Sequence, residues 1–222
     1  MIEVLYEDNH LIVINKQSGD IVQGDKTGDK PLPDFVKDYL REKYNKPGNV
    51  FCGVIHRLDR PVSGIVLFAK TSKALSRMNQ LFRDKEIQKI YWALVENKPI
   101  KTNDRLENYL LKNQQKNKSR VYLKPGNGAL KATLDYQVLK SLDRYTLLEV
   151  KPITGRHHQI RVQLSHMGSV IKGDLKYGAK RSNKDASISL HAREINFIHP
   201  IKKQPIKIIA PVPNEALWKA CE

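Results

Sequence analysis

The sequence contains only two cysteines, Cys52 and Cys221, among its 222 residues. Two thiols can build neither a disulfide framework nor a four-cysteine zinc site within one chain. Long apolar runs are also missing, because stretches such as Ile65 to Ala69 fall far short of the roughly 18 residues that a membrane-spanning helix needs. The N-terminal segment carries acidic residues where a secretion signal carries basic ones followed by an apolar run. We therefore expect a folded cytoplasmic protein that does not cross a membrane.

Acidic residues are scarce compared with basic ones. The chain has 23 Asp and Glu against 39 Lys and Arg, which gives a formal net charge of +16 at pH 7. Such a charge favours a polyanionic partner, because each Lys or Arg that meets a phosphate releases a condensed counterion. Nucleic acid is the first candidate, and a basic surface that is merely well solvated is the alternative.

Two basic clusters stand out along the chain. Between Lys112 and Lys131 there are six basic residues and no acidic one, among several Asn, Gln and Gly, so we expect a mobile basic loop or hairpin. Five basic residues between Lys172 and Lys184 are interrupted only by Asp174. The two clusters can flank one groove if the fold brings them together. Their members are Lys112, Lys116, Lys118, Arg120, Lys124 and Lys131, and Lys172, Lys176, Lys180, Arg181 and Lys184.

Motifs for nucleotide cofactors and for metals are absent. The segment from Gly24 to Lys30 lacks the spacing of a phosphate loop, and Gly126-Asn127-Gly128 lacks the third glycine of a dinucleotide site. His157 and His158 are adjacent, and neighbours on a helix do not share a face. We therefore expect no nucleotide cofactor and no metal ion.

The hydrophobic pattern predicts one α+β domain over residues 1–222, built on a mostly antiparallel sheet, because no repeat or linker divides the chain. Apolar residues at helical spacing predict a helix over about 33–44, a second after a cap at Thr71 or Ser72, and a short third from Ile160 to Met167. Runs rich in β-formers predict strands over 10–15, 65–69, 90–95, 134–139, 145–150, 195–198 and 206–209.

A lone carboxylate, Asp59, lies between Arg57 and Arg60, just before the turn residues Pro61 and Gly64 and a buried strand. Opposite charge nearby favours the ionised form of a carboxylate, which suits a nucleophile or a base. The alternative is an Asp that caps the turn and pairs with one of the arginines.

The segment that contains Asp59, His56 to Gly64 with the sequence HRLDRPVSG, resembles the HRLDxxTSG signature of the RluA-type pseudouridine synthases, which isomerise uridine to pseudouridine in RNA. Further segments resemble the family's motifs in the expected order, and the resemblance covers about residues 3–211. Gln17 and Val62 stand where the family usually has Pro and Thr. The further segments are Asn15 to Gly19 (NKQSG), Lys89 to Val95 (KIYWALV), Gly155 to Arg161 (GRHHQIR), Gly173 to Gly178 (GDLKYG) and Leu190 to Pro200.

The resemblance implies a pseudouridine synthase fold, in which helices and loops flank a mixed, mostly antiparallel central sheet with an active-site cleft across it. It implies that Asp59 is the catalytic carboxylate, either a covalent nucleophile or a base at C2′, in a reaction without a cofactor. Arg161 matches the arginine that pairs with this Asp, and Tyr91 matches the aromatic residue that stacks on the target base. Leu190 matches an apolar residue of the pocket.

The resemblance also implies contacts with RNA. The target uridine has to leave its helix or loop, and Arg57 resembles the arginine that enters the vacated space, with a phosphate contact as the alternative. His56 either orients the catalytic loop or is an ordinary hydrogen-bonded core histidine. The remaining residues expected to contact RNA are Arg60, Lys116, Lys118 and Arg120.

The implied substrate is ribosomal RNA, transfer RNA or both. No S4-type domain is expected, since the first motif begins at residue 15. The high positive charge favours a monomer. Two other functions stay open. A non-catalytic RNA-binding or ribosome-assembly module can keep the same fold, but a decayed site would have lost Asp59, Tyr91 or Arg161, and all three are present. A nuclease using Asp59 and nearby histidines would need a metal ion.

Overall fold

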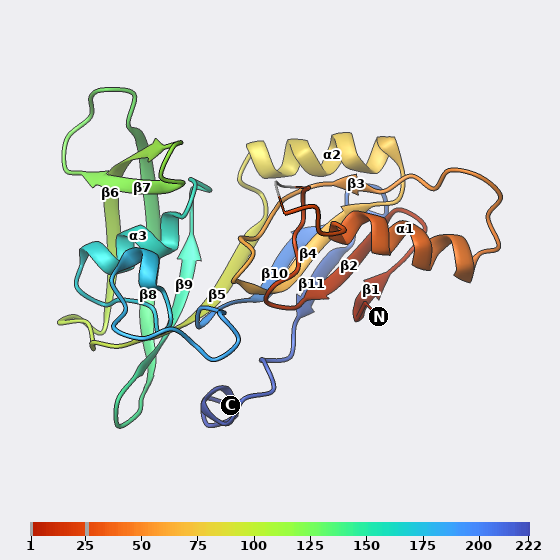
Figure 1. Cartoon of the computed structure of the whole chain (residues 1–222). Coiled ribbons are helices and arrows are strands. Elements are labelled where there is room, and N and C mark those ends of the chain that lie inside the picture. Colours follow the sequence, from red (N-terminus) through yellow and green to blue (C-terminus); the bar gives the residue numbers. More distant parts are fainter. Residues whose placement is uncertain (1, 25–26) are drawn as a thin grey trace. The chain divides into compact units, whose positions relative to one another are not determined.

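The computed structural model describes residues 2–24 and 27–222, which form two compact units (Figure 1). Unit 1 holds the described part of Met1–Gln88 together with Ala192–Pro213, and unit 2 holds Lys89–His191 together with Asn214–Glu222. Asp25 and Lys26, in the segment that lacks phosphate-loop spacing, lie outside the described residues. That the whole chain acts as one domain stays a prediction.

Unit 1 is built on a sheet whose central strands are buried along their whole length. The strands are β1 (Val4–Glu7), β2 (Leu11–Lys16), β3 (Gly53–Val54), β4 (Ser63–Ala69), β10 (Leu190–Ile198) and β11 (Pro205–Ile209). They follow the order β1-β2-β4-β10, with β3 paired to β4 and β11 paired to β10. Every residue of β2 and β4 is buried, and the two strands pair antiparallel. Such continuous burial explains why both strands could be predicted from short apolar runs.

Two helices of twelve residues accompany this sheet, α1 (Leu32–Lys43) and α2 (Ser72–Arg83). The buried residues of α1 recur about once per turn, so one side of the helix faces the protein interior. α2 begins where the Thr71 hydroxyl accepts a hydrogen bond from the Ala74 N–H at 3.1 Å. Both helices and the predicted cap are thereby confirmed.

Glu7, at the end of β1, is the polar centre of unit 1. Its carboxylate accepts hydrogen bonds from Lys43 at 2.7 Å, Lys70 at 2.6 Å and Tyr44 at 2.7 Å. The side chains of Glu7 and Lys70 are each only 8% exposed. Burial raises the pKa of Glu7, but these hydrogen bonds outweigh it and lower the pKa to about 2. Glu7 therefore stays ionised and ties α1 to the sheet.

Asp8 lies beside the buried imidazole of His199, with 3.0 Å between Oδ2 and Nε2. Burial raises the pKa of Asp8, but hydrogen bonds from Lys202 and from two backbone N–H groups lower it well below its usual range. Nδ1 of His199 accepts hydrogen bonds from the N–H groups of Ile201 and Lys202, and burial lowers the pKa of His199. The fold therefore favours a neutral imidazole next to an ionised carboxylate.

The pKa shifts of Glu7, Asp8 and His199 predict that unit 1 loses stability in acid. A pKa that is lower in the folded state means that the unfolded chain binds more protons, so stability falls as the pH decreases. The loss begins below about pH 6.5 through His199 and steepens below about pH 4.5 as the two carboxylates take up protons, down to about pH 2. Urea unfolding at a series of pH values measures this profile.

Glu7→Gln tests the carboxylate part of that profile. We expect the variant to lower the free energy of unfolding at pH 7 by about 3 kcal/mol, because the buried Lys70 loses its counter-charge. The fall below about pH 4.5 should become shallower. Glu86→Gln, at an exposed position of the same unit, is the matched control. If the free energy of unfolding falls as steeply below about pH 4.5 in Glu7→Gln as in the wild type, other carboxylates cause the fall.

Unit 2 is built on antiparallel strands with short helices. Its strands are β5 (Gln88–Val95), β6 (Asn103–Asn113), β7 (Lys118–Tyr122), β8 (Leu130–Ser141) and β9 (Thr146–Pro152), in the order β5-β9-β8-β6-β7. The helices are α3 (Gln159–His166), the 3-10 turn η1 (Leu175–Tyr177) and α4 (Ala216–Lys219). β6 and β7 pair as a hairpin, with Asn113 opposite Lys118. The first basic cluster is therefore a hairpin followed by a loop, one of the two forms that its sequence predicts.

The architecture is α+β with mostly antiparallel pairing, as the sequence predicts. All predicted strands and helices are present. β1 and β3 were not predicted, and the β6–β7 pair was predicted only as one of two alternatives, a loop or a hairpin. Among the described residues, no helix is both long enough and apolar enough to cross a membrane.

Candidate active site

Asp59 lies in a tight turn at the entry to β4. The N–H of Val62 donates to the carbonyl oxygen of Asp59 at 3.0 Å, which closes the turn one residue before the strand begins. The side chain of Asp59 is half-buried. A fully buried strand thus carries a reachable carboxylate at its end, which is the kind of rigid support that a catalytic group needs.

Lys16, the last residue of β2, fixes this turn from inside the protein. Its side chain is fully buried, and Nζ donates to the carbonyl oxygens of Gln17 at 2.9 Å, Arg60 at 3.1 Å and Val62 at 2.7 Å. Burial lowers the pKa of Lys16 to about 8, while the charges of nearby carboxylates, Asp59 among them, oppose the shift. One ammonium group therefore uses all three of its protons to hold the backbone at Gln17 and at two positions that follow Asp59 in the turn.

Two glycines complete the support of the turn. The N–H of Gly19 donates to the carbonyl oxygen of Arg60 at 2.9 Å, so the NKQSG segment is joined to the Asp59 turn. Gly64 has φ +107°, and a Cβ there would lie 2.4 Å from the carbonyl oxygen of Ala192 on β10. Only glycine fits at this close approach of two backbones.

The side chains next to Asp59 have partners in unit 1. Arg57 is exposed, and its Nη1 donates to Oε1 of Gln23. Arg60 forms an ion pair with Asp29 at 2.7 Å, in which both side chains are largely exposed. An exposed pair of this kind contributes little to stability, so both arginines can exchange these partners for phosphate.

His56 is fastened to the central sheet. Its Nε2 accepts a hydrogen bond from the N–H of Leu67 on β4 at 3.1 Å, and its ring stacks on Phe82 of α2 with 5.3 Å between centroids. Which of the two roles His56 has stays a prediction. Because His56 begins the HRLDRPVSG segment, the contact also fixes where that segment starts.

Unit 2 carries Tyr91, Leu190 and Arg161. Tyr91 lies on β5 opposite Val150 of β9 and is half-buried, and Leu190 is 3% exposed at the start of β10. Arg161 lies on α3 and forms a two-pronged ion pair with Asp174, with Nε to Oδ2 at 2.7 Å and Nη2 to Oδ1 at 2.9 Å. Both of these side chains are almost fully buried. The pair fixes the plane of the guanidinium group, which has further donors beyond these two.

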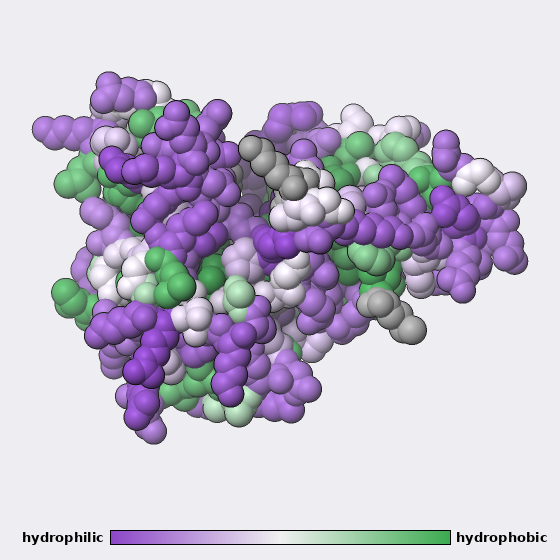
Figure 2. Space-filling view, in the orientation of Figure 1, coloured by the Kyte–Doolittle hydropathy of each residue, from purple (hydrophilic) through white to green (hydrophobic). Residues whose placement is uncertain are grey.

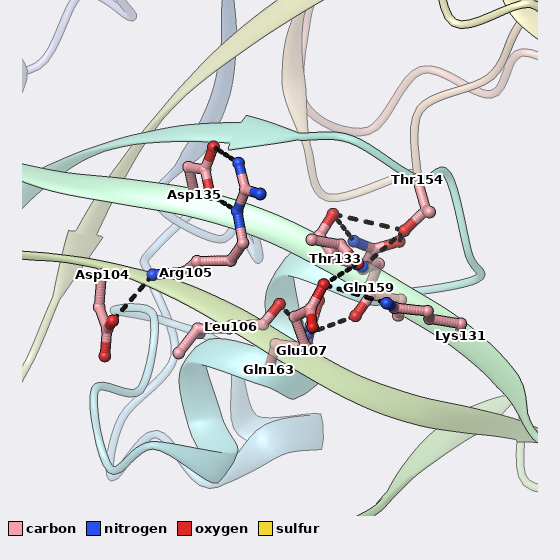
Figure 3. A network of polar contacts seen from close by, with 11 residues as sticks. Asp104, Arg105, Leu106, Glu107, Lys131, Thr133, Asp135, Thr154, Gln159 and Gln163 are labelled. Carbon is pink, nitrogen blue, oxygen red and sulfur yellow. Dashed lines mark hydrogen bonds and ion pairs between the residues drawn. The ribbon is translucent and has the colours of Figure 1, made fainter. Parts of the chain in front are cut away.

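Figure 3 shows how α3, which carries Arg161, is fastened to the sheet of unit 2. Nε2 of Gln159 donates to the carbonyl oxygen of Thr133 on β8 at 3.0 Å, and Nε2 of Gln163 donates to that of Leu106 on β6 at 3.3 Å. Both glutamines are buried. Because they stand two residues before and two residues after Arg161, they fix the rotation of the helix that aims it.

Two adjacent histidines connect α3 to the basic hairpin. His158 has φ +53° and its Nδ1 lies 2.9 Å from the hydroxyl of Tyr177, which also accepts a hydrogen bond from the Ser119 N–H at 2.8 Å. His157 stacks on His158 with 3.8 Å between centroids, and its Nδ1 lies 2.9 Å from Oγ of Ser119. Side chains of the GRHHQIR and GDLKYG segments therefore hold β7 to the N-terminus of α3.

The structure places the predicted residues in both units. Asp59 lies in unit 1, and Tyr91, Arg161 and Leu190 lie in unit 2. Within unit 2, Arg161 is paired with Asp174, a partner that the sequence did not predict. The pairing of Arg161 with Asp59 stays a prediction.

Sequence reasoning missed three residues that organise these groups: Lys16, Asp174 and Tyr177. Lys16 and Asp174 are charged residues with 0% and 1% exposure, and Tyr177 is 5% exposed. All three lie within the NKQSG and GDLKYG segments, so their positions were identified but their contacts were not. In residues 2–24 and 27–222, no group of three or more His, Cys, Asp or Glu side chains is placed to hold a metal ion.

Comparison with known proteins gives matches over most of the chain. The family model described as RNA pseudouridylate synthase matches residues 10–166. The ribosomal large subunit pseudouridine synthase C of Buchnera aphidicola subsp. Acyrthosiphon pisum is 37% identical over 216 residues, covering 94% of this chain and 67% of that protein. The tRNA pseudouridine synthase C of Vibrio cholerae serotype O1 is 32% identical over 237 residues, covering 99% of this chain and 93% of that protein.

Solved structures share the fold. Human RNA Pseudouridylate Synthase Domain Containing 4 matches with a TM-score of 0.81 at 24% identity, over 97% of this chain and 90% of that chain. Human RNA Pseudouridylate Synthase Domain Containing 1 matches with a TM-score of 0.77 at 21% identity, over 100% of this chain and 87% of that chain. These likenesses confirm the fold that the motifs predicted.

Proposed function

This chain belongs to the RNA pseudouridylate synthase family, and from that premise we propose that it isomerises specific uridines of structured RNA to pseudouridine, with Asp59 as the essential carboxylate. The matched region, residues 10–166, contains Asp59, Tyr91 and Arg161. Their joint presence is the observation that carries the proposal. A module that had kept only the fold and bound RNA without catalysis would have no need of all three.

The reaction breaks the N1–C1′ bond of uridine, turns the uracil and joins C5 to C1′. C5 loses its hydrogen as a proton and N1 gains one, so neither an oxidant nor a reductant takes part. Asp59 acts either as a nucleophile at C1′, giving a covalent intermediate, or as a base at C2′. In this proposal Arg161 keeps the carboxylate ionised by its opposite charge, and Tyr91 stacks on the uracil.

The target uridine has to be extruded from its helix or loop, which costs a few kcal/mol of stacking and pairing. In this proposal the guanidinium group of Arg57 enters the space that the base leaves. The exposed position of Arg57, two residues before Asp59, supports this role, because the same short segment then holds the extruded sugar and fills the gap.

Two classes of RNA are candidates for the substrate. The relatives are named for ribosomal large subunit RNA and for tRNA, and the identities are similar, 37% and 32%. The chain matches 67% of the length of the first relative and 93% of the second. We therefore propose ribosomal RNA, transfer RNA or both, and the experiment has to present both pools.

Tritium release from RNA labelled at C5 of uridine tests the proposed function. Joining C5 to C1′ must release that hydrogen, so we expect release from ribosomal RNA, transfer RNA or both, prepared from cells that lack this gene. The reaction is run in chelator, where a metal-dependent nuclease would be inactive. Tight RNA binding without release from either pool would favour the non-catalytic module.

The basic hairpin supplies a second prediction. If Lys116, Lys118 and Arg120 contact phosphates, changing all three to Gln should weaken RNA binding and lower the slope of log affinity against log salt by about 2 to 3. Filter binding at a series of salt concentrations measures the slope. The matched control changes three exposed lysines elsewhere, Lys73, Lys98 and Lys219. If the slope of log affinity against log salt is the same for the hairpin triple variant and the wild type, these three side chains do not contact RNA phosphates.

A further inference from the structure

A pocket of about 310 Å³ opens in unit 2 between β7 and α3. One side is formed by residues 118–121 of β7, and the other by Val162, Ser165 and His166 of α3, with Tyr177 between them. No acidic residue lines it. Its volume lies in the range that holds a small organic ligand.

The lining of this pocket is part apolar and part cationic. Val162 and Tyr177 belong to a buried hydrophobic cluster, and Val121 packs against that cluster. Lys118 and Arg120 supply positive charge on the β7 side, and Nζ of Lys118 lies 5.1 Å from the centre of the Tyr177 ring. A ligand with an apolar or aromatic body and a negative group fits such a lining.

The shape of the pocket is fixed by hydrogen bonds. The Tyr177 hydroxyl accepts from the N–H of Ser119 at 2.8 Å, and the Ser165 hydroxyl donates to the Tyr177 carbonyl oxygen at 2.6 Å. Tyr177 is thereby tied both to β7 and to α3. A pocket held in this way loses little freedom when a ligand enters, which favours binding.

The two basic clusters of the sequence meet at this pocket. Nζ of Lys176, in the second cluster, donates to the carbonyl oxygen of Asn117 at 3.0 Å, directly next to Lys118 of the first. In Figure 2 the surface over the β6–β7 hairpin, at the upper left, is mostly hydrophilic with a few apolar side chains. The positive charge beside the pocket is therefore supplied by both clusters, as a polyanion requires.

We propose that this pocket binds a nucleotide of the RNA substrate other than the target uridine. Its base packs against Val121 and Val162, and its phosphate lies near Lys118 and Arg120. The volume and the half-buried Val121 favour a whole nucleotide over a phosphate group alone, because a phosphate would leave this apolar part of the lining uncovered. The inference rests on the proposed function only in taking RNA as the ligand.

Val121→Trp tests the pocket without changing any charge. The larger side chain fills the space between β7 and α3, so we expect about tenfold weaker binding of the RNA pool that supports tritium release, which is the order of one lost base–protein contact. KM should rise by a similar factor and kcat should stay unchanged, because the reacting uridine binds elsewhere. Leu123→Trp, at an exposed position two residues further on, is the control and should bind normally.

A charge-matched pair of variants keeps the test sound if Val121→Trp folds poorly. Lys118→Gln with Arg120→Gln removes the pocket charges, and Lys116→Gln with Lys124→Gln removes two exposed charges of the same hairpin and loop outside it. If the pocket binds RNA, the double variant at Lys118 and Arg120 should lose clearly more RNA affinity than the double variant at Lys116 and Lys124. Equal losses for both pairs, or wild-type affinity in a folded Val121→Trp, would overturn the pocket and leave only a diffuse positive surface.

The two proposals fail in different ways. If the wild-type protein releases no tritium but binds RNA, and Val121→Trp weakens that binding, the pocket stands and the proposed function falls. If the wild type releases tritium and Val121→Trp matches it in KM, the function stands and the pocket falls. Free uridine monophosphate added as a competitor should leave RNA binding unchanged at concentrations near those of the RNA. Full competition would instead make the pocket a site for free nucleotides.

Discussion

Asp59→Asn is expected to fold, to bind RNA and to lose tritium release by about 10⁴-fold or more, the usual consequence of removing the central group of a catalytic set. Asn has nearly the same shape as Asp, so the turn closed by the Val62 N–H onto the backbone carbonyl at 3.0 Å is retained. The amide can act neither as a nucleophile at C1′ nor as a base at C2′. The loss should therefore appear in kcat.

The control for Asp59→Asn is Asp143→Asn, which removes the same charge at an exposed position. Both variants are compared by urea unfolding, by RNA filter binding and by tritium release with the same RNA pool. Asp143→Asn should release tritium at the wild-type rate. If Asp59→Asn releases tritium at more than about one hundredth of the wild-type rate, Asp59 is not the essential carboxylate, because that rate is far above the residual activity expected.

The centre of unit 1 could be predicted from the sequence because β2 and β4 are buried on both faces. β2 and β4 read as short apolar runs, and each is buried at every residue. The Asp59 segment could be assigned because its motif stands directly before such a run. A local pattern and a family motif then pointed to the same place, which is why the position of Asp59 at the edge of a core strand was expected.

The extents of β6 and β7 could not be predicted, and a hairpin was only one of two alternatives, because their pattern carries no apolar alternation. In Asn103–Asn113 only Leu110 is buried, and in Lys118–Tyr122 only Ser119 is. Most of their side chains are exposed or half-buried, so a period of two in hydrophobicity is missing. Their pairing is decided by backbone hydrogen bonds with β8 and with each other, which leave no trace in composition.

Long-range polar contacts could not be predicted from the sequence for a different reason. Arg161 and Asp174 are 13 positions apart, and Lys16 contacts Arg60 and Val62 across 44 and 46 positions. A buried charge has to be paired or fully hydrogen-bonded, but the sequence does not say by which partner. The motifs NKQSG and GDLKYG marked where such residues lie, and only the fold shows what they hold.

Lys16→Met is expected to lower both stability and turnover. Met nearly matches Lys in length and removes the cost of burying a charge whose pKa burial has already lowered to about 8. It also leaves the carbonyl oxygens of Gln17, Arg60 and Val62 without the donor that they share. Each buried acceptor that loses its partner costs about 1–3 kcal/mol, so the net loss in the free energy of unfolding should be about 3 kcal/mol.

The effect of Lys16→Met on turnover separates positioning from stability. Arg60 and Val62 follow Asp59 in the same turn, and a carboxylate misplaced by about 1 Å can lose about 100-fold in rate. Measured well below the melting temperature, kcat should therefore fall by about 100-fold while KM and RNA affinity stay near wild type. Lys73→Met, on the exposed side of α2, is the control and should change neither quantity.

A folded Lys16→Met that keeps the wild-type kcat would mean that the turn is held by its other contacts. The strongest of these is the hydrogen bond from the Gly19 N–H to the Arg60 carbonyl at 2.9 Å. It holds the turn at Arg60 alone, whereas Lys16 holds it at Arg60 and Val62 at once. Because a two-point support restrains rotation of the turn and a one-point support does not, we expect the loss of Lys16 to re-aim the carboxylate, even where the chain stays folded.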